Sequence, residues 1–158
     1  MQKSEILRFE RFSGWFDFAT FVAAKEAGRK HWALFAPPSS PGVYFFATDL
    51  ASRLRGESDI YYIGRAKQNL RGRIGKYLYR VNRSAERERY AGWVGSERSP
   101  EQGIASLVEH CQPVEIGWIV TETGDVALRI EAELLTAYEN EHGQLPPNNR
   151  IGGARLSL

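Results

Sequence analysis

Apolar and polar residues follow two different periods along this chain. Residues 42–48, 60–64 and 114–121 are short runs rich in β-branched and aromatic residues, and turn-forming residues bound them, so we predict three β-strands. The first two runs are close together in sequence, and a hairpin is their simplest arrangement. Because side chains alternate along a strand, Tyr44 and Phe46 are expected on one face of the sheet.

Four further segments repeat apolar residues at spacings of three and four, which predicts amphipathic helices. They are residues 15–30, 69–81, 100–111 and a last helix with Asp125 as N-cap that runs through about residue 141. Gly28 is expected to end the first helix and Gly143 the last. Residues 49–59 are predicted to be a connection, and the polar pattern of residues 83–100 predicts no particular element.

The order of these elements is helix, two strands, two helices, strand and helix, which predicts an α+β fold with a small sheet. A chain of 158 residues suits a single domain, residues 1–158, and is long enough to bury a core. No apolar run is long enough to span a membrane, and the N-terminus has no secretory pattern. Cys111 is the only cysteine, which excludes a disulfide framework and a cysteine metal cluster. We therefore expect a cytoplasmic protein with no membrane partner.

The net charge of +2 hides an uneven distribution. Residues 65–90 contain nine Lys or Arg and two acids, whereas residues 122–141 contain six acids and one Arg. A block of positive charge favours a polyanionic partner near residues 65–90. Two solvated helix faces would give the same pattern, and charge alone does not separate these interpretations.

Two charged residues interrupt apolar helix faces. Glu131 lies on the same predicted face as Leu134 and Tyr138, where a carboxylate needs a cation, a donor or a proton. Arg73 shares a face with Ile74 and is the arginine of its helix most expected to point inward. The alternatives are that the carboxylate lies at the edge of its stripe and reaches water, and that the arginine snorkels over a buried stem.

Five short sequence elements occur in one order along the chain. They are "GVY" at 42–44, "YIG" at 62–64, "LRGRIGKY" at 70–77, "RIEAELLTAY" at 129–138 and "LPPNNR" at 145–150. In this order they resemble the GIY-YIG nuclease family over roughly residues 41–150, with residues 1–40 as an N-terminal helical extension. The resemblance implies an α+β fold with a small three-stranded antiparallel sheet flanked by helices. It also implies one divalent cation, Mg²⁺ or Mn²⁺, and hydrolysis of DNA phosphodiester bonds.

The resemblance also implies roles for individual residues. The two motif tyrosines correspond to Tyr44 and Tyr62, the helix arginine to Arg73 and the metal-binding carboxylate to Glu131. The asparagine that often closes the motif set corresponds to Asn149, with Asn148 as the alternative. Where some members of the family have a lysine this chain has Arg65, and where others have a histidine it has Tyr77. The missing histidine leaves a tyrosine, Tyr44 first, as the expected base, provided that nearby cations lower its pKa.

Basic residues in and around the second and third motifs are expected to hold phosphates that flank the cleaved bond. These DNA-binding candidates are Arg65, Lys67, Arg71, Lys76 and Arg80. The competing hypothesis is a nucleic-acid-binding module that has the same fold and does not cleave its ligand.

Overall fold

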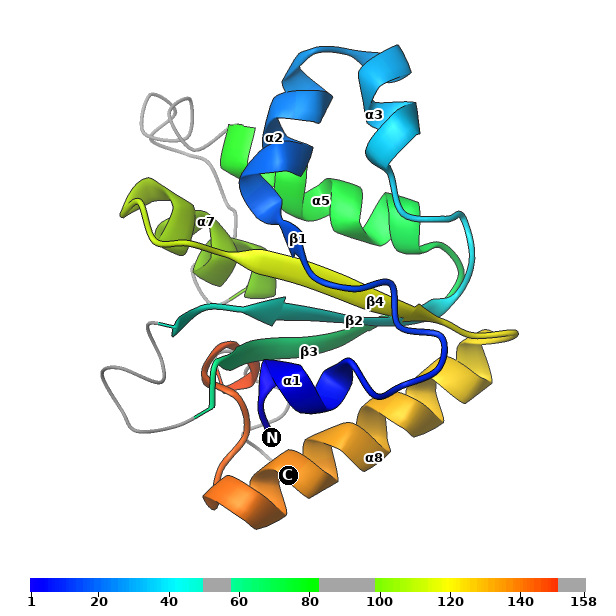
Figure 1. Ribbon diagram of the computed structural model, residues 1–158, viewed down its shortest axis with the longest axis vertical. Helices are drawn as coiled ribbons and strands as arrows, with labels where there is room; N and C mark the ends of the chain where they lie inside the picture. The colour runs from blue at the N-terminus through cyan, green and yellow to red at the C-terminus, as the bar shows by residue number, and fades with distance from the viewer. Residues whose placement is uncertain (50–57, 83–98, 151–158) are drawn as a thin grey trace.

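A computed structural model of the protein describes residues 1–49, 58–82 and 99–150 (Figure 1). The strands are β1 (Phe16–Asp17), β2 (Gly42–Ala47), β3 (Ile60–Ala66) and β4 (Glu115–Val120). The helices are α1 (Lys3–Ile6), α2 (Phe18–Glu26), α3 (Arg29–Phe35), α5 (Leu70–Asn82), α7 (Pro100–Glu109), α8 (Gly124–His142) and a 3-10 helix, η1 (Pro147–Asn149). Most of the connection expected at 49–59 and most of the unassigned segment 83–100 lie outside the described residues.

The predicted α+β class is confirmed, but the predicted three-stranded sheet is wrong by one strand. The sheet has four antiparallel strands in the order β1-β4-β2-β3. The extra strand comes from the segment predicted as the start of a helix, because the Asp17 side chain accepts a hydrogen bond from the backbone of Ala19 and caps α2 there. Phe16 and Asp17 therefore remain extended and pair with the start of β4.

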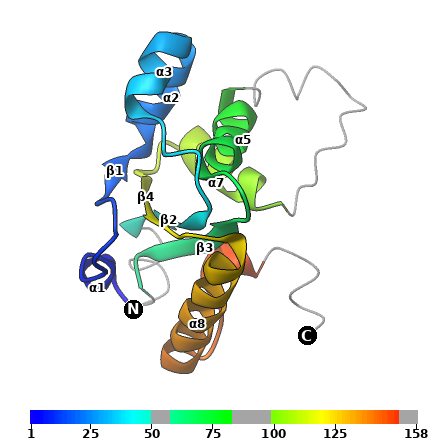
Figure 2. The same ribbon diagram turned by 90° about the vertical axis from the view of Figure 1, so that its right-hand side faces the viewer.

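Helices cover both faces of the sheet, as Figures 1 and 2 show from two directions. The helices α2, α3, α5 and α7 lie on one side, and α1 and α8 lie on the other. The apolar core is divided in the same way, with Tyr44 and Phe46 in one cluster and Val43 and Phe45 in the other. The face alternation predicted for the first strand is thus confirmed, and β2, with a strand on each side, is buried along its whole length.

The last helix positions the carboxylate that interrupts its apolar face. Its N-cap is Thr123, whose hydroxyl accepts from the backbone of Val126, so the predicted cap at Asp125 is wrong by two residues and Asp125 lies in the first turn. The predicted end is confirmed, because Gly143 has a φ of 77° and closes the helix in the left-handed conformation. Ala127, Glu131 and Leu134 form the buried stripe toward the sheet.

Two helices, α2 and α3, occupy the region of the single helix predicted over residues 15–30, and the short α1 before them was not predicted. Gly28 has a φ of 111°, a conformation that favours glycine, and it separates α2 from α3. Phe18 and Phe21 of α2 enter the same core cluster as Tyr44, whereas Ile6 of α1 enters the opposite one. No helix in the described part of the chain is long and apolar enough to cross a membrane.

Candidate active site

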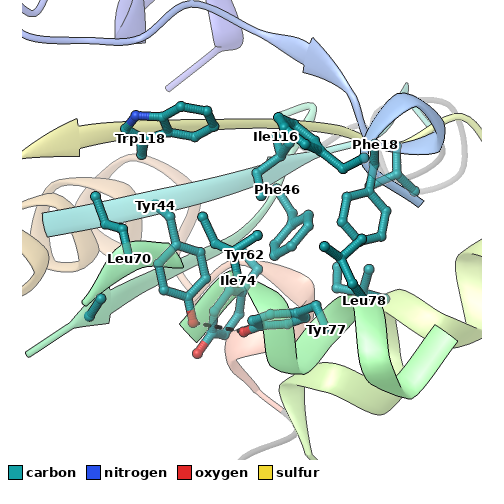
Figure 3. Packing of buried hydrophobic residues seen from close by; sticks show 14 of the residues in the cluster. Phe18, Tyr44, Phe46, Tyr62, Leu70, Ile74, Tyr77, Leu78, Ile116 and Trp118 are labelled. Carbon is teal, nitrogen blue, oxygen red and sulfur yellow. Dashed lines mark hydrogen bonds between the residues drawn. The ribbon is translucent and has the colours of Figure 1, made fainter. Parts of the chain in front are cut away.

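Three tyrosines from three elements meet on the α5 side of the sheet. They are Tyr44 of β2, Tyr62 of β3 and Tyr77 of α5, with ring centroids 5.7 to 6.4 Å apart. The hydroxyl oxygens of Tyr44 and Tyr77 are 2.8 Å apart and form a hydrogen bond. Figure 3 shows that the hydroxyl end of Tyr62 points toward this pair of hydroxyl groups. The pairing of β2 with β3 brings Tyr44 and Tyr62 together, and α5 contributes Tyr77 from the layer above the sheet.

Gly64 makes room for this cluster. It pairs with Tyr44 across the hairpin, and a Cβ atom at residue 64 would lie 2.6 Å from Cζ of Tyr44 and 2.5 Å from Cε2 of Tyr62. Any larger residue would collide with both rings. The glycine of the "YIG" element is therefore required by the packing of the two motif tyrosines.

Arg73 points inward from α5, as its position in the apolar stripe predicts. Its guanidinium carbon lies 5.9 Å from the ring centroid of Tyr44 and 5.2 Å from that of Tyr77, a cation–π arrangement. An Nη1 hydrogen bond and ion pair join it to the carboxylate of Glu101 at the start of α7. The sequence interpretation missed Glu101, although Pro100 marks a helix start where an acidic residue is favourable.

The electrostatics of the cluster do not suit Tyr44 as a base. Tyr44 and Tyr77 have no exposed surface. Burial raises the pKa of both phenols well above the usual value, and the opposing effect of Arg73 is smaller. The condition for Tyr44 to act as the base, a pKa lowered by nearby cations, is therefore not met in this structure. Tyr62 retains 5% of its surface exposed, so it is the one member of the trio with access to solvent.

The Arg73–Glu101 pair remains ionised. Burial alone would raise the pKa of the Glu101 carboxyl, but the hydrogen bond and charge of Arg73 outweigh it, and the pKa lies below its usual value. Burial alone would lower the pKa of Arg73, but Tyr44, Tyr77 and Glu101 raise it instead. A charged guanidinium, a quarter exposed, thus lies against the tyrosine rings.

A second group of candidate residues lies on the α8 side of β3. Nη1 of Arg65 is 3.1 Å from Oε1 of Glu131, and the Glu131 side chain is only 5% exposed. The alternative that Glu131 reaches water from the edge of its stripe is therefore wrong. Arg65 is 38% exposed, so it connects the buried carboxylate to the surface. Because Arg65 follows Gly64 directly, the two groups of candidate residues share one strand.

Asn149 stabilises the outer edge of that strand. Its side-chain amide accepts from the backbone N–H of Ile63 at 3.0 Å and donates to the Ile63 carbonyl at 2.8 Å. The amide thus takes the place of a neighbouring strand where β3 has none. Asn148, the alternative asparagine of the motif, instead donates to the carbonyl of Pro100 and connects η1 to α7. Asn149 therefore holds the edge of β3, and Asn148 holds the start of α7.

Replacing Asn149 by Ala should destabilise the fold, because two buried backbone groups of Ile63 would lose their partners. At about 1–3 kcal/mol for each unsatisfied group, we expect a loss of roughly 2–6 kcal/mol and a melting temperature lower by about 4–24 °C. Asn140→Ala, at an exposed position in α8, is the matched control and should melt like the wild type. Equal melting of the two variants in thermal denaturation would contradict the bracing role.

The predicted DNA-binding residues differ in their environment. Lys67, Arg71 and Lys76 are exposed, and Nε of Arg71 donates to the carbonyl of Pro37. Arg80 is half-buried, and its Nε and Nη2 both donate to Oε1 of Gln102 in α7. Arg80 therefore ties α5 to α7, whereas the other three present positive charge at the surface.

A divalent cation would find one buried carboxylate in this region. The described residues contain no cluster of three or more His, Cys, Asp or Glu side chains placed to hold a metal. Mg²⁺ does not need such a cluster, because it commonly keeps several waters and binds one or two carboxylates together with substrate phosphates. Glu131, with Arg65 beside it, fits this sparse arrangement.

The candidate residues form two groups, one on each face of β3. Tyr44, Tyr62, Arg73 and Tyr77 form the first, and Arg65 with Glu131 forms the second. The chain matches no protein-family model and no curated protein. Assignment of a function to this site therefore depends on its own residues and their arrangement.

Proposed function

We propose that the protein is a divalent-metal-dependent DNA endonuclease with a site of the GIY-YIG type. The observation that carries the proposal is the buried Glu131 carboxylate held by Arg65, one residue beyond the glycine on which the motif tyrosines pack. Burial of a carboxylate is costly, and Arg65, the cation that compensates its charge, is itself 38% exposed. Glu131 with Arg65 and the tyrosine cluster with Arg73 lie on opposite faces of β3, so a carboxylate and two guanidinium groups flank this edge strand.

The chemistry of phosphodiester cleavage suits these groups. The reaction needs an oriented water, stabilisation of the charge that develops on the phosphoryl oxygens, and help for the leaving oxygen. Arg73 has the planar fork that binds two phosphate oxygens, and the rings of Tyr44 and Tyr77 hold it in place. In this proposal Tyr62, which alone of the three tyrosines retains exposed surface, orients the attacking water. Tyr44 supports Tyr62 and Arg73 and does not act as the base.

Glu131 would be the protein ligand of the cation. When bound, Mg²⁺ or Mn²⁺ supplies Lewis-acid stabilisation of the phosphoryl and leaving oxygens. Arg65 holds the carboxylate of Glu131 in place and, with 38% of its side chain exposed, can also contact a phosphate. Both arginines pair with a carboxylate, so a phosphate has to share or displace these partners when DNA binds.

A non-cleaving nucleic-acid-binding module is the second candidate. The observation in its favour is that the Tyr44–Tyr77 pair is sealed from solvent and Arg73 is already bound to Glu101. In such a module the cluster would be a structural element, and the exposed cations would bind phosphates without chemistry.

Incubation with supercoiled plasmid separates these two functions. We expect the purified protein to convert the plasmid to nicked circles in Mg²⁺ or Mn²⁺, and to leave it intact when EDTA removes the metal. Gel electrophoresis of the products over time gives the rate. Binding of a labelled duplex in a filter assay without any nicking at millimolar metal would instead identify the binding module.

A further inference from the structure

A basic groove lies between α5 and the N-terminal helices, beside the candidate active site. Its volume is about 460 Å³. In Figures 1 and 2, α2 and α3 lie next to α5 at this place. The lining includes residues of all three helices, among them Lys25, Trp32, Arg71, Gly75, Lys76 and Tyr79. Every charged residue that lines the groove is a cation, so the groove is complementary to a polyanion.

An aromatic ring is exposed in this positive groove. Tyr79 of α5 has 56% of its surface exposed, although most large apolar rings of the described residues are buried. On the opposite wall, the Lys25 ammonium lies 5.3 Å from the ring centroid of Trp32, which holds the charge at the groove. Grooves that combine cations with exposed aromatic rings are typical of surfaces that bind single-stranded nucleic acid.

Gly75 keeps the α5 wall of the groove low. Glycine inside a helix is less favourable than alanine, so its presence calls for a reason. A Cβ atom at residue 75 would meet no atom within 4 Å, which means that packing within the protein does not require glycine there. The missing side chain instead lets a ligand approach the helix backbone, next to Lys76 and Tyr79.

The groove adjoins the cluster that contains Arg73. Lys76 lines the groove, and its positive charge is one of the smaller causes of the lowered pKa of the Glu101 carboxyl. Arg73 and Lys76 are three residues apart on α5 and are neighbours on its surface. A strand that follows the groove therefore passes within one helical turn of Arg73.

We propose that this groove binds an unpaired DNA strand next to the cleavage position, with phosphates on Lys25, Arg71 and Lys76 and one base stacked on Tyr79. The volume of the groove, about 460 Å³, suits one nucleotide. A base can stack on the ring only when it is free of its own duplex neighbours. The inference names the substrate class of the proposed nuclease, DNA with an unpaired segment beside a duplex, and so rests on that function.

Fluorescence anisotropy with a labelled single-stranded 12-mer and the matching duplex tests the groove, in EDTA so that no cleavage interferes. Tyr79→Leu removes the ring and should weaken single-strand binding by about 5- to 150-fold, whereas duplex binding should change less than about 2-fold. Tyr79→Phe keeps the ring and should bind like the wild type. Gly75→Ala should raise the melting temperature and yet weaken single-strand binding. Phe9→Leu, which alters an exposed ring outside the groove, is the matched control.

The outcomes separate this inference from the proposed nuclease. Unchanged single-strand binding by Tyr79→Leu, or an equal loss for the duplex, would overturn the inference even if the wild type nicks plasmid. A single-strand defect in both Tyr79→Leu and Gly75→Ala, with normal Phe9→Leu, would support it. The same defect in a protein that cuts neither plasmid nor a labelled duplex with a single-stranded flap in Mg²⁺ or Mn²⁺ would support the binding groove and refute the nuclease.

Discussion

Glu131→Gln should abolish DNA cleavage and leave folding and DNA binding close to those of the wild type. The amide keeps the shape of the side chain and an oxygen that accepts from Arg65, 3.1 Å from the carboxylate in the wild type. It removes the negative charge on which a hard cation depends. We expect no product above background in a plasmid-nicking time course, at any Mg²⁺ concentration. The melting temperature should shift by no more than a few degrees, because the ion partner Arg65 is already 38% exposed.

Glu133→Gln is the matched control for this result. Glu133 lies two residues further along α8, where it is exposed and faces away from the buried stripe. Removal of its charge should leave the cleavage rate within about 2-fold of the wild type. A dead Glu133→Gln beside an active Glu131→Gln would place the metal ligand elsewhere, and two active variants would show that neither carboxylate holds a catalytic cation.

Residue periodicity was enough to predict the parts of the fold that depend on burial. The alternation in β2 placed Tyr44 and Phe46 on one face, and the α8 stripe placed Glu131 toward the sheet, because a period reports directly which side chains face the core. The inward position of Arg73 follows from the same reasoning. Each of these features depends only on the local sequence and on which face of the strand or helix is apolar.

Long-range partners were beyond the same reasoning. The Glu101 carboxylate meets Arg73 because α7 packs against α5, and no spacing in the sequence reports that contact. The two-residue strand β1 is too short to show a period, and its pairing with β4 depends on where Asp17 caps the next helix. The raised pKa of Tyr44 likewise results from complete burial in the assembled core, whereas the sequence shows only the cations nearby.

Arg73→Lys should lower the cleavage rate by roughly 10²-fold or more while DNA affinity changes little. Lysine keeps the positive charge and can still pair with Glu101, but it loses the planar fork that binds two phosphate oxygens. It also loses the flat face that packs on the Tyr77 ring, 5.2 Å from the guanidinium carbon. Affinity is retained because several exposed cations share the ground-state binding of DNA. Single-turnover cleavage of a labelled substrate, with anisotropy for binding, measures the two effects separately.

A purely structural role for Arg73 predicts a different pattern. If the guanidinium serves only to join α5 to α7 through Glu101, Arg73→Lys should lower the melting temperature and leave the cleavage rate of the folded fraction unchanged. Arg129→Lys provides the matched control, since Arg129 is an exposed arginine of α8 outside both groups of candidate residues. It should behave like the wild type in melting and cleavage. Cleavage at the wild-type rate by Arg73→Lys would remove Arg73 from the transition state, because a lysine at this position cannot reproduce a two-point contact with phosphate.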